Sequence, residues 1–385
     1  MRILIDVRTL ARGGATGIGE YTRELVDALL AREERHNYIL FANSFRRLAL
    51  PDAWRRDPRV TIVNWHIPNK FLDILARSGR APFVDERTRA DLVWSPHFHA
   101  LPVRTAPRIV TFHDLAFLHH PDFFSVRQRF WHWLQDYPRQ ARAAQAIVTV
   151  SAFTKHDLIH SLEIPPERIH AIPSGINPRF RPIAENNPAR QAFKTAHGLH
   201  APFILSLCTL EPRKNVNAII RAFSLVKRDA RFHNLELVIA GRPGWLYRRI
   251  FKEAERSPFR NHIRFFGFVA PDDRPLLYNL ASLFVYPSFF EGFGFPPLEA
   301  QACGTPIIVS DRTALAEVVG ASGLRVNPWS VEELADGIRK ILTTRALHRK
   351  LKEEGLTNVS AYTWQLTAAR MHTLFTRYAK TKDRS

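Results

Sequence analysis

The chain lacks several features that mark large classes of protein. It has only two cysteines in 385 residues, Cys208 and Cys303, which excludes a disulfide framework and a four-cysteine metal site. No run of 18 or more apolar residues occurs, so no segment is predicted to span a membrane. The opening MRILIDVRTL meets an acidic residue after a short apolar run and does not have the pattern of an export signal. Together these absences predict a cytoplasmic location.

Acidic residues are also in short supply. The chain has 36 Asp and Glu against 55 Lys and Arg, a formal net charge of +19. Such a surplus favours an anionic partner: nucleic acid, an acidic lipid surface or a phosphorylated small molecule. The basic residues are spread along the chain, which fits a phosphate-handling or membrane-facing surface better than a nucleic-acid-binding arm. A basic surface without a specific partner stays open as an alternative.

The chain does contain a regular alternation of short β-branched runs and amphipathic segments. Between the first two runs, Ile18, Tyr21 and Leu25 share one helical face. This alternation is typical of a parallel sheet covered by helices on both faces, so the predicted fold class is α/β. The runs expected as buried strands are 2–7, 38–42, 91–95, 108–112, 146–150, 203–207, 235–240, 262–267, 283–287 and 305–310.

Two domains are expected, because the length exceeds the comfortable size of one hydrophobic core. The alternation stops in the proline-rich segment 164–190 and starts again after it. We therefore expect two Rossmann-like, doubly wound domains, 1–185 and 186–361, with 362–385 forming a helix that closes the first. Ligands of such sheets bind beyond the carboxyl ends of the strands, so a cleft between the domains is the expected site.

The segment YPSFFEGFGFPPLEAQACGTPIIVSD, residues 286–311, is the most informative part of the chain. A loop containing Glu291 follows a strand, and the double proline at 296–297 suits the first turn of a helix. We expect that helix to start at Pro297, with Glu299 in its first turn and its free N–H groups facing a pyrophosphate. Two carboxylates eight positions apart can then hold two polyol portions of one ligand. The alternative is a solvated loop acid and a glutamate that complements the helix dipole.

Several ordered motifs resemble the GT-B glycosyltransferases, specifically the large retaining family 4. They are TGIGEYTREL, TFHDLAFLHHP, VSAFTKHDL, IPSGINPRF, TLEPRKN and EGFGFPPLEAQACGTPII, the last being similar to the family's EX7E motif. The resemblance implies a GT-B architecture in which 1–185 binds the acceptor and 186–361 binds the nucleotide-sugar donor. It assigns the transferred sugar to Glu291 and the donor ribose to Glu299, with Gly292, Phe293 and Gly294 in the donor-binding loop.

The same resemblance assigns further donor contacts. His113 follows the strand RIVTF and corresponds to a histidine that contacts the reacting sugar. Gly17, in the glycine-rich segment 11–21, would lie against the donor phosphate or sugar. Backbone groups of Phe268 and Val269 would meet the nucleobase. For Gly17, a flexible turn before a helix is the alternative.

Arg213 and Lys214 follow the first strand of the second domain, in LSLCTLEPRKN. At that place they would neutralise the charge that grows on a leaving nucleoside diphosphate. Many similar proteins carry an arginine five or six residues before the lysine, where this chain has Thr209 and Cys208. We therefore expect Arg213 to take over that role. Away from a strand end, an Arg-Lys pair would be interpreted as a solvated turn.

No cofactor and no metal are expected. The glycine-rich segment 11–21 is not GxGxxG, which argues against a nicotinamide cofactor. His119 and His120 have no third ligand at a sensible spacing, and proteins of the family are typically metal-independent.

Two first-domain segments, 64–80 and 123–140, combine aromatic residues with arginines. Helical spacing places five residues of the second segment on one face, which predicts either core packing or a surface lying against anionic lipid. These residues are Val126, Phe130, Trp133, Leu134 and Tyr137.

The predicted function is transfer of a sugar with retention of its anomeric configuration. GDP-mannose is the first expectation for the donor and a UDP-sugar the second. A glycan or lipid-pyrophosphate-linked acceptor of bacterial cell-surface polysaccharide synthesis is implied by the resemblance, which allows a peripheral position on the inner face of the plasma membrane. Nucleic-acid binding is disfavoured because no binding motif occurs. A non-catalytic, membrane-associated nucleotide-sugar binder on the same fold is the remaining alternative.

Overall fold

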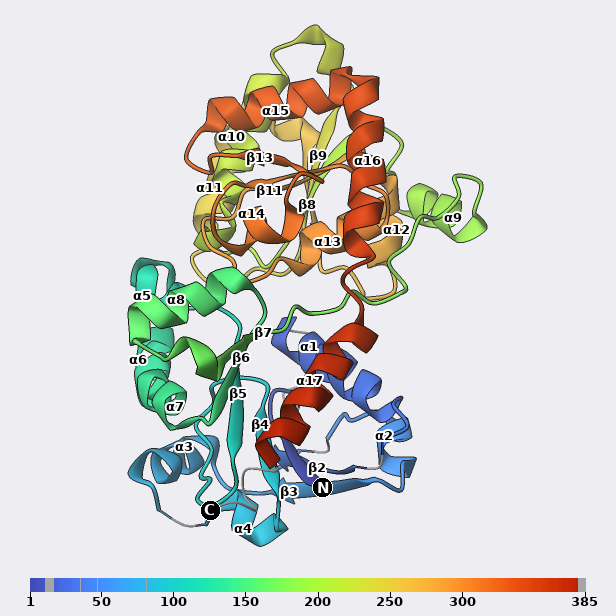
Figure 1. Ribbon diagram of the computed structural model, residues 1–385. Helices are drawn as coiled ribbons and strands as arrows, with labels where there is room; N and C mark the ends of the chain where they lie inside the picture. Colours follow the sequence, from blue (N-terminus) through green and yellow to red (C-terminus); the bar gives the residue numbers. More distant parts are fainter. Residues whose placement is uncertain (11–16, 35, 47, 81, 380–385) are drawn as a thin grey trace. The chain divides into compact units, whose positions relative to one another are not determined.

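The structure is a computed structural model that describes residues 1–10, 17–34, 36–46, 48–80 and 82–379. It divides into two compact units, shown in Figure 1. The first unit contains Met1–Gly175 and Trp364–Ser385, and the second contains Ile176–Thr363. Each unit is a parallel sheet with helices packed on it, so the predicted α/β fold class with two doubly wound domains is confirmed.

The first unit is built on a seven-stranded sheet in the order β3-β2-β1-β4-β5-β6-β7, and every pairing is parallel. The central strands β4, β5 and β6 are buried along their whole length, as expected where helices cover both faces. The strands are β1 Arg2–Asp6, β2 Asn37–Asn43, β3 Val60–Trp65, β4 Leu92–Ser95, β5 Arg108–Phe112, β6 Ala146–Thr149 and β7 Ile169–Ala171.

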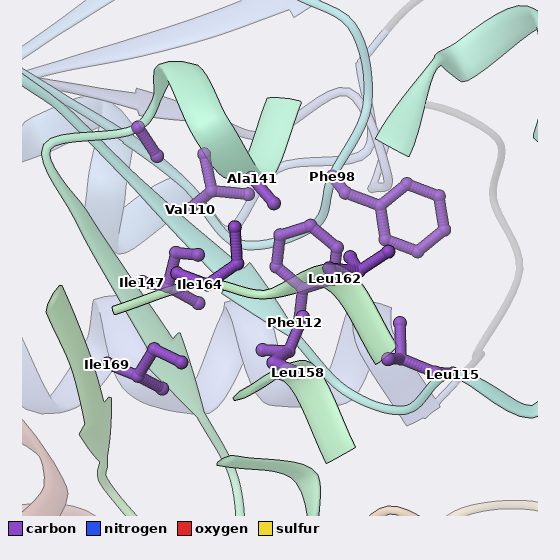
Figure 2. Close-up of a cluster of buried hydrophobic side chains, with 11 residues drawn as sticks. Phe98, Val110, Phe112, Leu115, Ala141, Ile147, Leu158, Leu162, Ile164 and Ile169 are labelled. Carbon is purple, nitrogen blue, oxygen red and sulfur yellow. The ribbon is translucent and has the colours of Figure 1, made fainter. Parts of the chain in front are cut away.

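Helices of the first unit pack on this sheet through apolar side chains. Figure 2 shows one such core, in which Val110 and Phe112 of β5 and Ile147 of β6 meet Leu158 and Leu162 from a covering helix. The helices are α1 Gly17–Leu30, α2 Asp52–Arg56, α3 Asn69–Ser78, α4 Val84–Thr88, α5 Ala116–His119, α6 Val126–Gln135, α7 Tyr137–Ala143, α8 Ala152–Leu162 and α17 Trp364–Ala379.

Helix α17 brings the end of the described chain back to the first unit, where it packs along α1. Trp364, Met371 and Phe375 are buried there, and the Trp364 ring meets Tyr21 edge-on at 5.8 Å between centroids. The hydroxyl of Thr367 donates a 2.8 Å hydrogen bond to the carbonyl of Pro173.

The second unit is built on a six-stranded parallel sheet in the order β10-β9-β8-β11-β12-β13. Its strands are β8 Phe203–Leu207, β9 Glu236–Ala240, β10 Ile263–Gly267, β11 Leu283–Tyr286, β12 Ile307–Ser310 and β13 Leu324–Val326. Its helices are α9 Pro188–Ala196, α10 Val216–Val226, α11 Arg248–Arg256, α12 Arg274–Leu280, α13 Phe295–Ala302, α14 Thr313–Val319, α15 Val331–Thr343 and α16 Arg345–Val359.

The boundary between the units lies at Gly175–Ile176, not at 185–186 as expected. The segment that follows is held on the second unit by Asn279. The Asn279 side chain accepts a hydrogen bond from Ile183 N at 2.7 Å and donates one to the Arg181 carbonyl at 3.0 Å. The prolines therefore mark an extended segment anchored by hydrogen bonds, of which 164–175 belongs to the first unit.

The apolar face expected for 126–137 is only partly correct. Val126, Phe130 and Trp133 are exposed, so core packing is the wrong interpretation for them. Tyr137 does pack against the core, together with Trp131, which is not among the five expected residues.

In both sheets the order of the strands reverses beside the first strand of the unit. In the first unit the chain leaves β1 toward β2 and β3 and returns to the other side of β1 at β4. The second unit repeats this pattern with β8 and β11. In open parallel sheets such a switch point is where ligands bind, outside the carboxyl ends of the two strands.

Candidate active site

The switch point of the second unit gathers three of the four predicted catalytic side chains from two loops. After β8, a single 3-10 turn at Pro212–Lys214 presents Arg213 and Lys214. After β11, the loop that precedes α13 presents Glu291. Glu291 is thus brought to Arg213 and Lys214, 78 and 77 positions away in the sequence, because β8 and β11 are neighbours.

Glu291 lies at the centre of this group. Lys214 Nζ donates to its Oε1 at 2.5 Å and to the hydroxyl of Tyr286 at 2.6 Å. Arg213 Nη1 donates to Glu291 Oε2 at 3.0 Å. The hydroxyl of Ser288 donates to Oε1 at 2.7 Å. A carboxylate held by this many charge-assisted hydrogen bonds is fixed in position.

Burial would raise the pKa of Glu291, but the adjacent Arg213 and Lys214 outweigh it and lower the pKa to about 2. The side chain is therefore ionised at every physiological pH. It can accept hydrogen bonds from sugar hydroxyls but cannot supply a proton. Since Glu291 is buried, the alternative of a solvated loop acid is wrong.

Arg213 has a second carboxylate partner. Its Nε donates to Glu211 at 3.0 Å, while its Nη1 reaches Glu291. The cluster of Glu211, Arg213, Lys214 and Glu291 thus contains two cations and two anions, and the pair of basic residues is not a solvated turn. The guanidinium bridges two carboxylates, which fixes its orientation.

Glu299 lies in α13, which begins at Phe295 and not at Pro297 as expected. The earlier start places Glu299 in the second turn, so complementing the helix dipole from the first turn is not its role. Its carboxylate is buried, and the hydroxyl of Tyr278 donates to Oε2 at 2.9 Å. Arg274 lies 3.9 Å from Oε1. Two partners from α12 thus orient the predicted ribose ligand.

The loop Gly292–Gly294 connects Glu291 to α13 and is buried. Gly294 has φ +115°, and a Cβ there would lie 2.6 Å from Leu315 Cδ2. Only glycine fits both restrictions. Phe293 packs against Phe295 and Tyr362, with ring centroids 5.2 and 5.8 Å away. Its side chain belongs to the core, so any contact with a donor would come from its backbone.

Thr313 supports the same loop from the start of α14. Its hydroxyl accepts a 3.2 Å hydrogen bond from Glu291 N, and Ala314 N donates to the Glu291 carbonyl at 3.2 Å. Thr313 has φ +59°, a conformation that is strained for a β-branched residue. The hydrogen bonds to Glu291 hold the backbone in this strained conformation.

The predicted base-binding residues lie at the carboxyl end of β10. The ring of Phe268 is about half exposed, and Arg242 lies over it at 4.0 Å from the centroid. Val269 is buried, which leaves its backbone for recognition. Gly241 is required beside them, since a Cβ there would lie 1.8 Å from the Cys208 carbonyl oxygen.

His113 lies at the end of β5 in the first unit. Its Nε2 is 2.8 Å from the carbonyl of Pro96, which can only accept, so Nε2 carries the proton. Nδ1 is then an acceptor. Burial lowers the His113 pKa despite the bond to Pro96, which favours the neutral ring. Tyr21 meets the ring edge-on at 4.8 Å between centroids. This imidazole is fixed to accept a hydrogen bond from a hydroxyl.

Other predicted features of the first unit are placed as follows. Gly17 is the first residue of α1 and is exposed, while 11–16 of the same glycine-rich segment lie outside the described residues. Asp114 accepts a hydrogen bond from Ala116 N at 3.0 Å and so orients the loop. His119 pairs with Asp157 at 2.6 Å. Within the described residues no group of three or more His, Cys, Asp or Glu could hold a metal ion.

The sequence analysis missed the residues that hold the predicted ones in place. Tyr286 and Ser288 bind the Glu291 carboxylate, Glu211 binds Arg213, and Tyr278 binds Glu299. The motif YPS at the end of a strand and the glutamate two positions before Arg213 are the signals that could have found three of them.

Comparison with known proteins agrees with this arrangement. The family "Glycosyltransferase Family 4" matches residues 15–180, and "Glycosyl transferases group 1" matches residues 189–357. The chain is 29% identical over 367 residues to O-antigen chain mannosyltransferase B of Escherichia coli, covering 91% of this chain and 93% of that protein.

Two solved structures show the same fold. Sucrose-phosphate synthase from Thermosynechococcus elongatus has a TM-score of 0.77 at 19% identity, covering 98% of both chains. Anabaena HepE in complex with UDP-glucose has a TM-score of 0.73 at 17% identity, covering 98% of this chain and 100% of that one. With each unit matched by a glycosyltransferase family, the chain belongs to the family 4, or group 1, glycosyltransferases, enzymes with the GT-B fold.

Proposed function

We propose that this enzyme transfers mannose from GDP-mannose, with retention, to a glycan or lipid-linked oligosaccharide acceptor in bacterial cell-surface polysaccharide synthesis. The observation that carries the proposal is the buried cluster of Glu291, Arg213 and Lys214 at the switch point of the second unit. The similarity to an O-antigen chain mannosyltransferase supports mannose as the sugar. The complex of HepE with UDP-glucose, a protein of the same fold, favours a UDP-sugar as the second candidate.

Each residue has a role in the proposed transfer. Arg213 and Lys214 stabilise the leaving diphosphate, together with the N-terminus of α13. Glu291 accepts hydrogen bonds from the transferred sugar, and Glu299 accepts them from the ribose. The backbone of Phe268 and Val269 meets the base, and that of Gly292, Phe293 and Gly294 lies along the donor.

The first unit contributes His113 and Gly17. Nδ1 of His113 accepts a hydrogen bond from a hydroxyl of the reacting sugar, and Gly17 lies near the donor phosphate or sugar. The acceptor hydroxyl attacks from the face that the diphosphate leaves, and a phosphate oxygen takes its proton. No metal or cofactor is part of the proposed reaction, because protein cations supply the charge that the leaving diphosphate requires. Full activity in excess EDTA is the expected result.

The enzyme is further proposed to lie on the anionic inner face of the plasma membrane. Helices α3 and α6 pack together and expose Phe71, Ile74, Phe130 and Trp133, each more than half accessible. Exposed basic side chains lie among them, including Lys70, Arg127 and Arg129. Apolar side chains that enter the headgroup layer and cations that meet anionic lipid give peripheral binding. None of the described helices is both long enough and apolar enough to cross a bilayer.

Thermal unfolding with millimolar GDP, UDP, ADP or dTDP tests the donor. A ligand at about a hundred times its dissociation constant adds roughly 2.7 kcal/mol of stability, which is a visible shift. A rise with GDP alone is expected. A rise with UDP alone would replace the donor, and no rise with any of the four would contradict the proposed site. Retention is then read from the anomeric proton coupling of the product.

A further inference from the structure

A polar cavity lies within the first unit. It has a volume of about 490 Å³ and is lined by residues that follow β1, β2, β3 and β4, together with residues of α3 and α6. Since the strand order reverses between β1 and β4, the cavity occupies the switch point of this sheet, where open parallel sheets bind ligands. It is large enough for one or two sugar rings.

Four polar side chains that line the cavity are each at least nine-tenths buried: Arg8, Asn43, Asp73 and Gln135. Buried polar groups cost free energy unless they are hydrogen-bonded, so their concentration around one empty volume requires a supporting network.

That network is present. Arg8 Nη2 donates to Asp6 at 2.7 Å and to the Ala100 carbonyl at 3.0 Å. Gln135 Nε2 donates to Asp73 at 3.0 Å, and Gln135 Oε1 accepts from Ala100 N at 2.8 Å. These bonds join β1, β4, α3 and α6 around the cavity.

Two further hydrogen bonds orient the side-chain amide of Asn43. Asn43 Nδ2 donates to Asn69 Oδ1 at 2.7 Å, and Asn43 Oδ1 accepts from Ile67 N at 3.0 Å. Planar amides and carboxylates held in fixed orientations suit the paired donors and acceptors of vicinal hydroxyl groups.

Two aromatic residues complete the lining. Phe45 stands at the rim and is 69% exposed, while Trp131 is partly buried and meets the His99 ring edge-on at 5.4 Å. An exposed ring beside ordered amides offers the apolar C–H face of a pyranose a surface on which to pack.

The charges around this cavity balance one another. Arg8 is neutralised by Asp6 and has Asp73 on its other side. Arg46 at the rim is the only other cationic side chain in the lining that the structure describes. Arg8 and Arg46 are matched by Asp6 and Asp73, so the cavity has no surplus charge, and a neutral polyol requires none.

The cavity is connected to His113 by a short row of rings. The His99 ring lies 4.4 Å from that of His97, which lies 6.3 Å from that of His113. Only the rings of His99 and His97 therefore separate a ligand in the cavity from the residue proposed to contact the reacting sugar.

We propose that this cavity binds a neutral sugar unit of the acceptor glycan next to the unit that is extended. The inference rests on the proposed function, because it takes His113 as the place of transfer. It assigns acceptor recognition to Arg8, Asn43, Phe45, Asp73, Trp131 and Gln135.

Saturation-transfer NMR with a synthetic mannotrioside, in the presence of saturating GDP, tests the proposal on the intact chain. We expect signal transfer to the sugar protons of the wild type and at least a fivefold weaker affinity in Phe45→Ala and Asp73→Asn. Trp329→Ala, at an aromatic residue of the second unit that is as exposed as Phe45, is the matched control and should bind like the wild type.

The GDP-induced rise in melting temperature is measured on every variant. If Phe45→Ala and Asp73→Asn keep the GDP-induced rise in melting temperature and bind the mannotrioside as tightly as the wild type, the acceptor site is overturned. The donor proposal then stays intact. Absence of mannotrioside binding by folded wild type would overturn it as well. A wild type without any nucleotide-induced rise would instead count against the proposed function.

Discussion

At the scale of single residues, Glu291 is paired with the buried Lys214 and with Arg213, which is partly buried. Removing one member of a buried ion pair leaves the others uncompensated and costs about 3–5 kcal/mol. Glu291→Gln, which keeps the shape of the side chain, should therefore lower the free energy of unfolding by about 3 kcal/mol, measured by urea denaturation. Glu332→Gln removes an exposed carboxylate from the same unit and should leave the free energy of unfolding unchanged.

The same residue predicts a dependence on pH. The pKa of Glu291 falls from an ordinary 4.5 to about 2 on folding, so the unfolded chain binds the proton more readily. Its stabilisation, about 3 kcal/mol, is present above pH 4.5 and is lost as the pH falls toward 2. The difference in unfolding free energy between wild type and Glu291→Gln should shrink between pH 5 and pH 3. A constant difference would contradict the assignment.

Lys214 and Glu299 should affect different steps. Lys214→Ala removes a cation from the leaving diphosphate and should lower kcat by about a hundredfold. Glu299→Ala removes a ligand of the ribose and should chiefly raise the KM for the donor. Steady-state kinetics at saturating acceptor separates the two, and equal effects of both variants on donor affinity alone would refute this division.

The sequence was sufficient to predict that Arg213, Lys214 and Glu291 meet. Arg213, Lys214 and Glu291 follow strands, and the carboxyl ends of parallel strands share one edge of a sheet. The partners Tyr286 and Ser288 were not predicted, because a hydrogen bond to Glu291 depends on loop geometry that no periodic pattern encodes.

At the scale of elements, the start of α13 depends on Gly294. An alanine there would meet Leu315 in a backbone conformation that disfavours any side chain. Gly294→Ala should cost about 2–4 kcal/mol by thermal unfolding and weaken nucleotide binding. Gly320→Ala, at φ +55° with nothing within 4 Å of the added methyl, isolates the backbone contribution and should cost about 1 kcal/mol.

Strands buried on both faces were predictable, because their short runs are dominated by β-branched and other apolar residues. The strands β3, β7 and β13 were missed for different reasons. β3 is an edge strand that is only partly buried, and the other two are three residues long. For α6 the spacing identified a face but not its environment: Phe130 and Trp133 lie on the outside while Trp131 packs inward.

At the scale of the whole molecule, the net charge of +19 predicts strong but salt-sensitive binding to anionic vesicles. Sedimentation with phosphatidylglycerol vesicles should show binding that weakens steeply between 50 and 500 mM salt. The double variant Phe130→Ala, Trp133→Ala should lower the vesicle binding that persists at high salt at least fivefold. A replacement at an exposed aromatic residue of the second unit, Trp329→Ala, is the control. Equal loss in both would mean that the α3–α6 surface has no special part in binding.

Helix α17 has a consequence for the order in which the enzyme is made. The second unit is continuous in sequence, so it can close as soon as residue 363 has left the ribosome. The first unit is synthesised earlier but must wait for Trp364, Met371 and Phe375 to cover α1. During that interval its unfilled surface is exposed to chaperones and to other nascent chains. The part of the enzyme that is translated first is therefore the part that folds last.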